Sequence, residues 1–400
     1  MIKIGIIKEG KHPIDRRVPL TPQQAKQLQS EFDVEVFVQS SDIRCFKDEE
    51  YESLGLQIVE DLESCDIILG VKEVPIDWLI PHKTYFFFSH TIKKQDYNKD
   101  LFKTILDKKI RLIDYEVLTN ERGERLIAFG RWAGIVGAYN GIKTYGERYN
   151  FFHLKPAHEC FDLEELMNQL REIKLPSIKI IITGGGRVAK GSMEVMHALN
   201  VRKVNAERFL NEDFDEAVFV QLNSRDYNKH KNGLEFKRSE FFEHPENFER
   251  DFLKYTKVSD VLIAAAFWHP DSPVLFKREE ILRGDFQLRV IADITCDIEG
   301  SIPSTLQAST IDDPVYDYNP SEHRVENPYI DEANLSVMAV DNLPCELPRD
   351  SSQDFGKQLL SRIIPALLGS DEEKIIKRAT IARDGEVTDN FKYLSEWVEK

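Results

Sequence analysis

The sequence predicts an α/β protein with two doubly wound domains. Short apolar runs alternate with stretches long enough for helices through residues 2–115, which is typical of a parallel sheet with helices on both faces. A second sheet is expected to begin at residues 178–183, where an isoleucine-rich run leads into glycines and then into an amphipathic stretch. A chain of 400 residues is long enough for two or three domains.

The first domain is expected to begin with a strand at residues 2–8. Thr21 and Pro22 then predict the start of a helix, because threonine caps helix N-termini and proline fits the first helical turn. Further strands are predicted at 34–38, 66–71, 84–89 and 110–115.

Polar residues follow three of these strands. Lys72 comes after residues 67–71, His90 after 86–89, and Asp114 with Glu116 after 111–113. In open α/β sheets the carboxyl ends of the strands face the ligand crevice. Any one of these side chains alone would be interpreted as a charge leaving a strand for solvent, but three at equivalent ends indicate a site.

Basic residues near these strand ends could bind an anionic substrate. Arg16 and Arg17, Lys93 and Arg125 are the candidates, since guanidinium groups bind carboxylates with two parallel hydrogen bonds. Residues 130–149 carry small side chains at helical spacing, which predicts a close-packed helix that crosses from the first domain to the second.

The glycine-rich segment matches a dinucleotide-binding turn. Gly184, Gly186 and Ala189 fit the pattern G-x-G-x-x-A, in which the first glycine permits the turn and the second lets a pyrophosphate approach the backbone. The small third residue lets the helix pack closely on the strand. A purely structural turn is the alternative, but the strand before and the helix after favour a Rossmann fold that binds NAD or NADP.

The second sheet is predicted to continue after this turn, with residues 201–204 as its second strand. An acid usually ends that strand in proteins that prefer NAD. Asn205 stands there, near Lys203 and Arg208, which favours NADP weakly. Later strands are predicted at 261–266, 289–294 and 335–340. The stretch between Leu222 and Lys254, with a charged run at 223–231 and a segment at 241–252, is interpreted as an insertion.

The chain is expected to return to the first domain after residue 340. Residues 341–350 are rich in turn-forming residues, and a helix predicted at 355–368 would pack on the first domain. The predicted domains are therefore a catalytic, substrate-binding domain at 1–135, completed by 345–400, and an inserted Rossmann domain at 136–344.

Composition excludes several classes of function. A formal net charge of −16 disfavours nucleic acid and anionic membranes as partners. The five cysteines lack paired spacing, and His153, His158 and Cys160 are not completed by further ligands, so no metal site is expected. Without a signal peptide or a long apolar span, a cytoplasmic location is expected.

Five further segments are specific in combination. They are Gly-Val-Lys-Glu-Val-Pro (70–75), Phe-Phe-Ser-His-Thr-Ile-Lys (87–93), Arg-Leu-Ile-Asp-Tyr-Glu (111–116), Ala-Phe-Gly-Arg-Trp-Ala-Gly (128–134) and Ser-Val-Met-Ala-Val-Asp-Asn-Leu-Pro (336–344). These segments resemble the lysine-forming saccharopine dehydrogenases. They are more similar still to the lysine–2-oxoglutarate reductase half of aminoadipic semialdehyde synthase, within the alanine dehydrogenase and transhydrogenase superfamily.

The resemblance implies that lysine and 2-oxoglutarate condense to an imine, which hydride from NADH or NADPH reduces to saccharopine, and that the reverse reaction oxidises saccharopine. The expected partners are this small-molecule substrate and, in a possible homo-oligomer, further copies of the chain. It places the catalytic acid/base pair at Lys72 and His90. The remaining roles are substrate contacts at Arg17, Lys93, Gln95 and Arg125, and cofactor contacts at Phe129, Gly184, Gly186, Arg187, Val188 and Asp341.

Two alternatives remain open from the sequence. An amino-acid dehydrogenase of the alanine type would share the fold and the Arg-Lys-His set, although the insertion after Leu222 disfavours it. A regulator that binds NAD(P) without turnover is the other alternative, which the presence of Lys72 and His90 disfavours.

Overall fold

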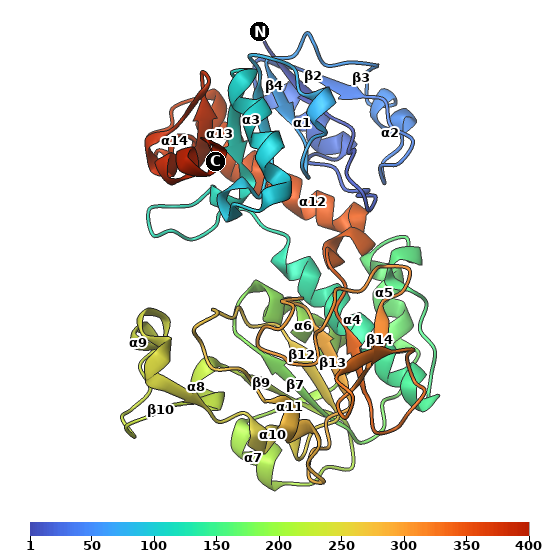
Figure 1. The fold of residues 1–400 in the computed structure, drawn as a ribbon. Helices are drawn as coiled ribbons and strands as arrows, with labels where there is room; N and C mark the ends of the chain where they lie inside the picture. Colours follow the sequence, from blue (N-terminus) through green and yellow to red (C-terminus); the bar gives the residue numbers. More distant parts are fainter. Residues whose placement is uncertain (400) are drawn as a thin grey trace. The chain divides into compact units, whose positions relative to one another are not determined.

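The computed structural model describes residues 1–399. The chain divides into two compact units. Unit 1 is formed by Met1–Phe129 and by the chain from Pro348 onward, and unit 2 by Gly130–Leu347. Both units are α/β folds, and the helices and strands of each are labelled in Figure 1.

Unit 1 is built on an eight-stranded sheet. From β1 to β6 the paired strands run parallel, as predicted, and β3 is an additional strand that the sequence analysis missed. In spatial order the strands are β18 (Glu386–Val387), β17 (Thr380–Arg383), β6 (Arg111–Asp114), β5 (Thr84–Phe87), β4 (Ile67–Leu69), β1 (Ile2–Ile6), β2 (Val34–Gln39) and β3 (Gln57–Val59).

The predicted first helix is confirmed as α1 (Pro22–Glu31). Thr21 caps it in a reciprocal arrangement: its Oγ1 accepts the Gln24 N–H at 3.4 Å, and Gln24 Oε1 accepts the Thr21 N–H at 3.0 Å. Unit 1 also contains α2 (Asp48–Glu52), α3 (Lys99–Asp107), α12 (Pro348–Gln358), α13 (Ile364–Leu368), α14 (Ile375–Ala379), α15 (Ser395–Glu399), the short helical turns η1 (Ile76–Trp78), η2 (Thr91–Lys93), η3 (Asp96–Asn98), η4 (Tyr115–Val117) and η9 (Asp389–Leu394), and a π-helical turn, η8 (Leu359–Ile363).

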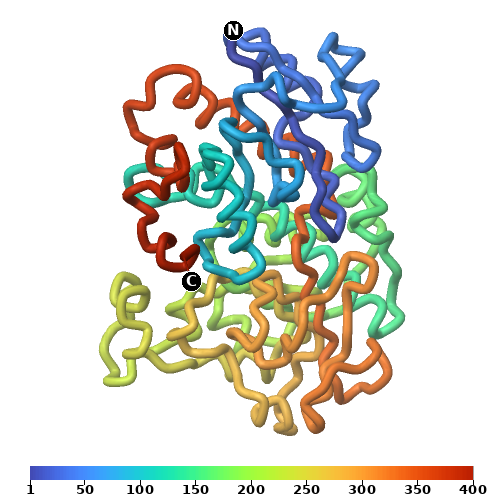
Figure 2. Tube along the Cα trace, turned by 45° about the horizontal axis from the view of Figure 1, so that its top comes forward, coloured from blue at the N-terminus to red at the C-terminus, as the bar shows by residue number. Residues whose placement is uncertain are grey.

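The C-terminal segment completes unit 1, with β17 pairing antiparallel to β6. Figure 2 shows the red C-terminal chain beside the cyan segment that carries β6. Phe355 of α12 stacks on Phe129 with ring centroids 4.5 Å apart, so the predicted packing of residues 355–368 on the first domain is confirmed. The C-terminal segment also contributes the strands β17 and β18. Ile381 and Ala382 of β17 lie beside β6 and are completely buried.

Unit 2 contains a second eight-stranded sheet. From β16 to β8 its neighbouring strands run parallel, and β14 and β15 add an antiparallel edge. In spatial order the strands are β15 (Arg324–Glu326), β14 (Val315–Asn319), β16 (Leu335–Met338), β13 (Val290–Asp293), β12 (Val261–Ala264), β7 (Lys179–Thr183), β9 (Val218–Leu222) and β8 (Arg202–Val204).

The strand beside β7 is β9, and this corrects the prediction that residues 201–204 fill that place. β9 pairs with β7 along its whole length, and β8 lies outside β9 at the edge of the sheet. The burial of the two strands explains the order. β9 reads Val-Phe-Val-Gln-Leu and is almost entirely buried, whereas Arg202 and Lys203 of β8 are exposed.

Two glycines allow α4 (Gly130–Tyr149) and α6 (Arg187–Ala198) to pack closely against each other. A Cβ at Gly134 would lie 1.9 Å from the Val188 carbonyl oxygen, and one at Gly191 would lie 2.0 Å from the Arg131 carbonyl oxygen. The helices therefore touch backbone to backbone. The predicted helix is confirmed, but all of it lies in unit 2 instead of crossing between domains.

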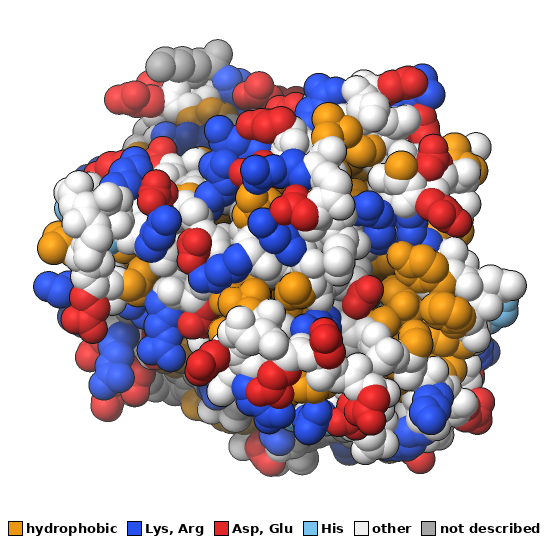
Figure 3. Space-filling model, turned by 90° about the horizontal axis from the view of Figure 1, so that it is seen from below, with side chains coloured by type: hydrophobic (Ala, Val, Ile, Leu, Met, Phe, Trp, Pro, Cys, Tyr) orange, Lys and Arg blue, Asp and Glu red, His pale blue; other side chains and the backbone are white. Residues whose placement is uncertain are grey.

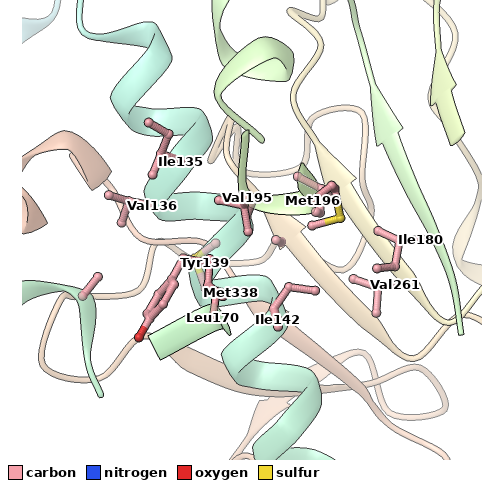
Figure 4. Packing of buried hydrophobic residues seen from close by; sticks show 14 of the residues in the cluster. Ile135, Val136, Tyr139, Ile142, Leu170, Ile180, Val195, Met196, Val261 and Met338 are labelled. Carbon is pink, nitrogen blue, oxygen red and sulfur yellow. The ribbon is translucent and has the colours of Figure 1, made fainter. Parts of the chain in front are cut away.

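The core beneath these helices is continuous with the sheet. Figure 4 shows side chains of α4 and α6 beside side chains from strands of the sheet. The labelled residues include Tyr139 and Ile142 of α4, Val195 and Met196 of α6, and Ile180 of β7, and all belong to one buried cluster.

Residues 224–252 form a small substructure with its own aromatic cluster. β10 (Asn228–His230) and β11 (Phe248–Arg250) pair antiparallel, and α9 (Arg238–Glu243) lies between them in the sequence. The ring centroids of Phe241 and Phe248 lie 5.2 Å apart. The other helical segments of unit 2 are α5 (Leu163–Arg171), α7 (Ala206–Asn211), α8 (Ser224–Tyr227), α10 (Leu253–Thr256), α11 (Arg278–Ile281), η5 (Ala157–Glu159), η6 (Pro245–Asn247) and η7 (Leu343–Glu346).

Acidic and basic side chains are interspersed over the face shown in Figure 3, with a patch of hydrophobic side chains at its right. None of the helices within residues 1–399 is long and apolar enough to cross a membrane.

Candidate functional site

The carboxyl edge of the unit 1 sheet carries the predicted acid/base residues. Lys72 follows β4, His90 follows β5 and Glu116 lies in η4 after β6. Because these strands are parallel neighbours, the residues that follow them emerge at the same edge. The sequence-based expectation that these strand ends are equivalent is confirmed, while the catalytic roles stay a prediction.

Glu9 fixes the backbone at Lys72. Its two carboxylate oxygens accept the N–H groups of Val71, at 2.7 Å, and of Lys72, at 2.9 Å. Burial and the nearby carboxylate of Asp15 raise the pKa of Glu9 to about 8. This carboxyl group therefore accommodates a neutral form close to neutral pH.

The surroundings of Lys72 disfavour its charged form. Burial lowers the pKa of its ammonium group, and the positive charge of Arg17 lowers it further. Within residues 1–399 the Lys72 Nζ atom forms no hydrogen bond, so its donors are available to a ligand. A lysine with a depressed pKa can act as a general acid or base.

Arg17 is held in place by a buried ion pair. Its Nε and Nη2 atoms donate to the two carboxylate oxygens of Asp15 at 3.0 and 2.6 Å, and its guanidinium group lies 4.2 Å from the centroid of the Phe129 ring. The predicted cofactor residue Phe129 thus lies in unit 1, between Arg17 and Phe355.

His90 is oriented by Glu73. Its Nδ1 lies 2.6 Å from Glu73 Oε1, and Lys11 donates to both oxygens of the same carboxylate at 2.8 and 2.7 Å. Burial alone would raise the pKa of Glu73, but the hydrogen bonds from His90 and Lys11 outweigh it and lower the pKa to about 2. Because an ionised carboxylate only accepts hydrogen bonds, Nδ1 carries its proton and Nε2 remains for a substrate.

The predicted substrate residues Lys93, Gln95 and Arg125 lie at the exposed rim of this edge. Arg125 Nη2 lies 2.5 Å from Glu116 Oε1, and Lys93 Nζ lies 3.8 Å from the same oxygen. Gln95 is exposed and accepts a hydrogen bond from the Tyr97 hydroxyl at 2.9 Å. Glu116 thus brings Lys93 and Arg125 together.

The glycine-rich turn of unit 2 has the geometry that a bound pyrophosphate requires. Gly184 has a φ of +94°, which favours glycine, and a Cβ there would lie 3.0 Å from Ala266 Cα. A Cβ at Gly186 would meet no atom within 4 Å. The space beside Gly186 is therefore open to a ligand, and its glycine is not required by contacts within the protein.

A cavity of about 730 Å³ opens on this turn. Such a volume is typical of cofactor and small-molecule sites. Arg187 and Val188, both predicted cofactor residues, line it together with Gly184 and Gly186. The residues that line this cavity fit a dinucleotide.

Two predicted cofactor residues lie elsewhere in unit 2. Asn205 follows the edge strand β8, and its Oδ1 caps α7 by accepting the Arg208 N–H at 2.9 Å; it does not line the cavity on the turn. Asp341 is exposed and follows Val340, beyond the carboxyl end of β16. It lies at the same edge of the sheet as the glycine-rich turn, because β16 to β7 are parallel.

Sequence reasoning missed the acidic residues that orient the predicted ones. Glu9, Asp15 and Glu73 were available as charged residues close to strand ends and to Arg17, but their partners are set by side-chain geometry. Among residues 1–399, no cluster of three or more His, Cys, Asp or Glu residues could hold a metal ion.

The comparisons with known proteins first concern the N-terminal part of the chain and the fold. Residues 5–136 match the family described as alanine dehydrogenase/PNT, N-terminal domain. The chain also has the fold of a solved L-alanine dehydrogenase, with a TM-score of 0.65 at 15% identity over 99% of this chain and 100% of that one. The first part of the chain is therefore similar to that N-terminal domain, and the chain as a whole shares the fold of the solved dehydrogenase.

The resemblance seen in the sequence is confirmed by two kinds of relative. The chain is 30% identical to the alpha-aminoadipic semialdehyde synthase of Arabidopsis thaliana over 98% of its own length and 41% of that protein. It is 24% identical to the saccharopine dehydrogenase [NAD(+), L-lysine-forming] of Yarrowia lipolytica over 91% of the chain and 92% of the relative. The chain spans less than half the length of the synthases that it matches.

Proposed function

We propose that this chain is an NAD(P)-linked oxidoreductase that interconverts saccharopine with L-lysine and 2-oxoglutarate. The observation that carries the proposal is that Lys72 and His90 lie at the same edge of one sheet. Lys72 has a depressed pKa, and His90 is oriented by Glu73. The similarity to named saccharopine dehydrogenases over most of the chain supports this substrate class.

The reaction joins the ε-amine of lysine to the keto carbon of 2-oxoglutarate. The carbinolamine that forms first must lose water, so one group donates a proton to its hydroxyl while another takes a proton from the nitrogen. Lys72 and His90 supply these two groups in the proposal. Saccharopine oxidation runs through the same proton transfers in reverse.

Hydride transfer to the imine carbon is the chemistry that a bound NAD(P)H supplies. Gly184, Gly186, Arg187 and Val188 would hold its pyrophosphate, since the cavity opens directly beside them. Phe129 and Asp341 are further proposed contacts. Asn205 is the least supported, because its side chain caps α7.

The substrate's carboxylates require fixed positive charge in a chain whose net charge is −16. Arg17 is proposed as the principal anchor, because Asp15 and Phe129 hold its guanidinium group in one orientation. Lys93, Gln95 and Arg125 are proposed to contact the more exposed end of the substrate. The 2.5 Å contact between Arg125 and Glu116 would then rearrange when a carboxylate binds.

A spectrophotometric assay tests the proposal. Purified protein is supplied with saccharopine and NAD⁺ or NADP⁺, and separately with lysine, 2-oxoglutarate and NADH or NADPH. The expected result is a change in NAD(P)H absorbance that requires both carbon substrates in the reductive direction. Turnover of alanine, or of pyruvate with ammonia, would instead identify an amino-acid dehydrogenase. Nucleotide binding without turnover of either set would identify a regulator.

A further inference from the structure

A second cavity of unit 2, of about 100 Å³, lies between α4, η5, η7 and the chain that leads into β14. Among the described residues, none lines both this cavity and the one on the glycine-rich turn. One water molecule needs about 10–15 Å³, so the cavity has room for several waters or one small ligand. Its polar lining residues are Asn140, Lys143, Thr144, His158, Asp312 and Glu346.

Glu346 directs one carboxylate oxygen to a ligand in this cavity. The side chain is only 3% exposed, and its Oε1 accepts a hydrogen bond from Asn140 Nδ2 at 2.9 Å. Its Oε2 lies 3.9 Å from His158 Nδ1, which is too far for a direct hydrogen bond. Within residues 1–399 no other group pairs with Oε2. Because an unpaired buried carboxylate is costly, burial raises the pKa of Glu346.

His158 faces the same oxygen with a buried nitrogen. Among the described residues its Nδ1 has no hydrogen-bond partner. Glu346 raises the pKa of the His158 ring, and the exposed acids Glu159 and Asp312 raise it further against the opposing effect of burial. Three acidic residues therefore surround this end of the cavity and attract positive charge to it.

The neighbouring polar groups offer acceptors in place of donors. Lys143 Nζ is paired with Glu147 Oε1 at 2.5 Å. The Thr144 hydroxyl donates to the Asn140 carbonyl oxygen at 2.7 Å, so Thr144 Oγ1 keeps lone pairs for a ligand. The cavity is consequently suited to a ligand that carries positive charge and donates several hydrogen bonds.

We propose that this cavity binds a primary ammonium group, from ammonium ion or from a small organic amine, between Glu346 Oε2 and the neutral ring of His158. An ammonium nitrogen can donate to two acceptors that lie 3.9 Å apart, and the exposed carboxylate of Asp312 favours its entry. Among residues 1–399 no set of three His, Cys, Asp or Glu residues could hold a metal ion. The inference goes beyond the proposed function, because the cavity contains neither the acid/base pair nor the glycine-rich turn.

The titration of His158 would measure occupancy in the full chain. NMR of protein with ¹³C-labelled histidine rings would follow its signal, which is assigned by its loss in His158→Gln. A cation that binds only the neutral ring lowers the apparent pKa of His158, by about one pH unit at ten times its Kd. Methylammonium and ammonium chloride should each produce this shift, and the larger shift identifies the preferred source. Potassium chloride and tetramethylammonium chloride, which donate no hydrogen bond, should not produce it at equal ionic strength.

Variants of the acidic residues locate the site. Glu346→Gln keeps an oxygen for Asn140 Nδ2 but removes the charge, so it should abolish the ligand-dependent shift. Asp312→Asn changes an exposed residue, which the fold tolerates, and should weaken methylammonium binding about two- to fivefold. Asp215→Asn, an exposed acid of unit 2 that does not line the cavity, should leave binding unchanged.

Three results would overturn the inference. Equal His158 titrations in methylammonium and tetramethylammonium would show that the cavity holds water only. A shift of the same size with potassium would show that the effect needs charge without hydrogen-bond donation. A shift that survives both Glu346→Gln and Asp312→Asn would place the amine elsewhere. None of these results depends on turnover of saccharopine, so this inference and the proposed function can fail separately.

Discussion

The hydrogen bond between His90 and Glu73 occupies Nδ1 of the imidazole and leaves Nε2 for a substrate. Glu73 is itself held by Lys11, so the imidazole is fixed from behind by a carboxylate whose charge is stabilised. Lys72 is fixed through its backbone by Glu9. The two proposed acid/base groups thus depend on different acidic residues, and each can be tested separately.

Replacement of either proposed catalytic residue should lower turnover. General acid/base assistance contributes about 10²- to 10⁴-fold, so Lys72→Met and His90→Gln should each reduce kcat within that range. The double variant should lose less than the product of the single losses, because the two groups act in one sequence of proton transfers.

Steady-state kinetics with saccharopine would measure these losses, with calorimetry for the cofactor. NAD(P)H affinity should barely change, since both residues belong to unit 1 and the glycine-rich turn to unit 2. Lys103→Met, which removes an exposed lysine of α3, is the control. Full turnover by Lys72→Met or His90→Gln would remove that residue from the mechanism.

Glu9 should make the stability of the chain depend on pH. Its pKa is about 8 in the folded chain and near 4.5 in an unfolded one, so the folded state binds more protons between these values. The stability that this proton contributes is complete below about pH 4.5 and is lost as the pH rises through 8. Glu9→Gln removes this dependence.

Thermal unfolding of the wild type and Glu9→Gln from pH 5 to pH 9 would measure the effect. The Tm of the variant, relative to the wild type, should increase from pH 5 to about pH 8 and then level off. Glu121→Gln, in an exposed loop, should follow the wild type. A constant difference between Glu9→Gln and wild type would show that Glu9 is ionised throughout.

At the scale of elements, the glycines of unit 2 separate into two groups. Gly186 faces open space, whereas Gly134 and Gly191 face the backbone of a neighbouring helix. The same substitution should therefore affect ligand binding at one position and folding at the others.

Gly186→Val should abolish NAD(P)H binding and leave the fold intact, because its side chain would occupy the space of the pyrophosphate without meeting protein atoms. Calorimetry and circular dichroism would measure the two properties. Unchanged nucleotide affinity would mean that the turn is only structural.

Gly134→Ala should instead destabilise the chain. A Cβ 1.9 Å from the Val188 carbonyl oxygen forces α4 and α6 apart, and overpacking of this kind costs about 1–3 kcal/mol or more. Denaturant unfolding would measure the loss, with Ala133→Gly as a comparison on the same helix. Wild-type stability in Gly134→Ala would contradict the close helix contact.

The sequence predicted where strands lie along the chain better than it predicted which strands are neighbours in the sheet. Apolar runs located β1, β4 and β5, and with them the positions of Lys72 and His90, because strand ends follow from local pattern. The order of strands in a sheet does not follow from local pattern, because it depends on which buried surface each strand can cover. Asn205 was consequently assigned to the place beside the turn that the residues after β9 occupy. Glu9 and Glu73 were missed for a similar reason, because their roles come from hydrogen bonds that composition cannot show.

At the scale of the whole molecule, the two units differ in how the chain builds them. Unit 2 is one continuous segment, whereas unit 1 needs both ends of the chain. A fragment of residues 130–347 should therefore fold cooperatively and bind NAD(P)H by itself. Residues 1–129 alone should not, because they lack β17 beside β6 and Phe355 against Phe129.

Circular dichroism during thermal unfolding, with calorimetry for the nucleotide, would measure both fragments. Adding residues 348–400 to the 1–129 fragment should restore a cooperative transition. A cooperative transition in the 1–129 fragment alone would show that the C-terminal segment is dispensable for unit 1.

The discontinuity of unit 1 also sets an order of events during synthesis. Domains generally fold as their sequence emerges from the ribosome, yet the strands β1 to β6 must wait for Phe355 and β17 while all of unit 2 is translated. Folding of unit 2 in the meantime replaces a long flexible loop by a compact body. α4 and η7 lie near its two ends and pack together, with a Cβ at Gly137 only 3.2 Å from Leu343. The entropic cost of bringing the two ends of unit 1 together is thereby reduced, so we expect the folding of unit 2 to favour the folding of the unit that carries Lys72 and His90.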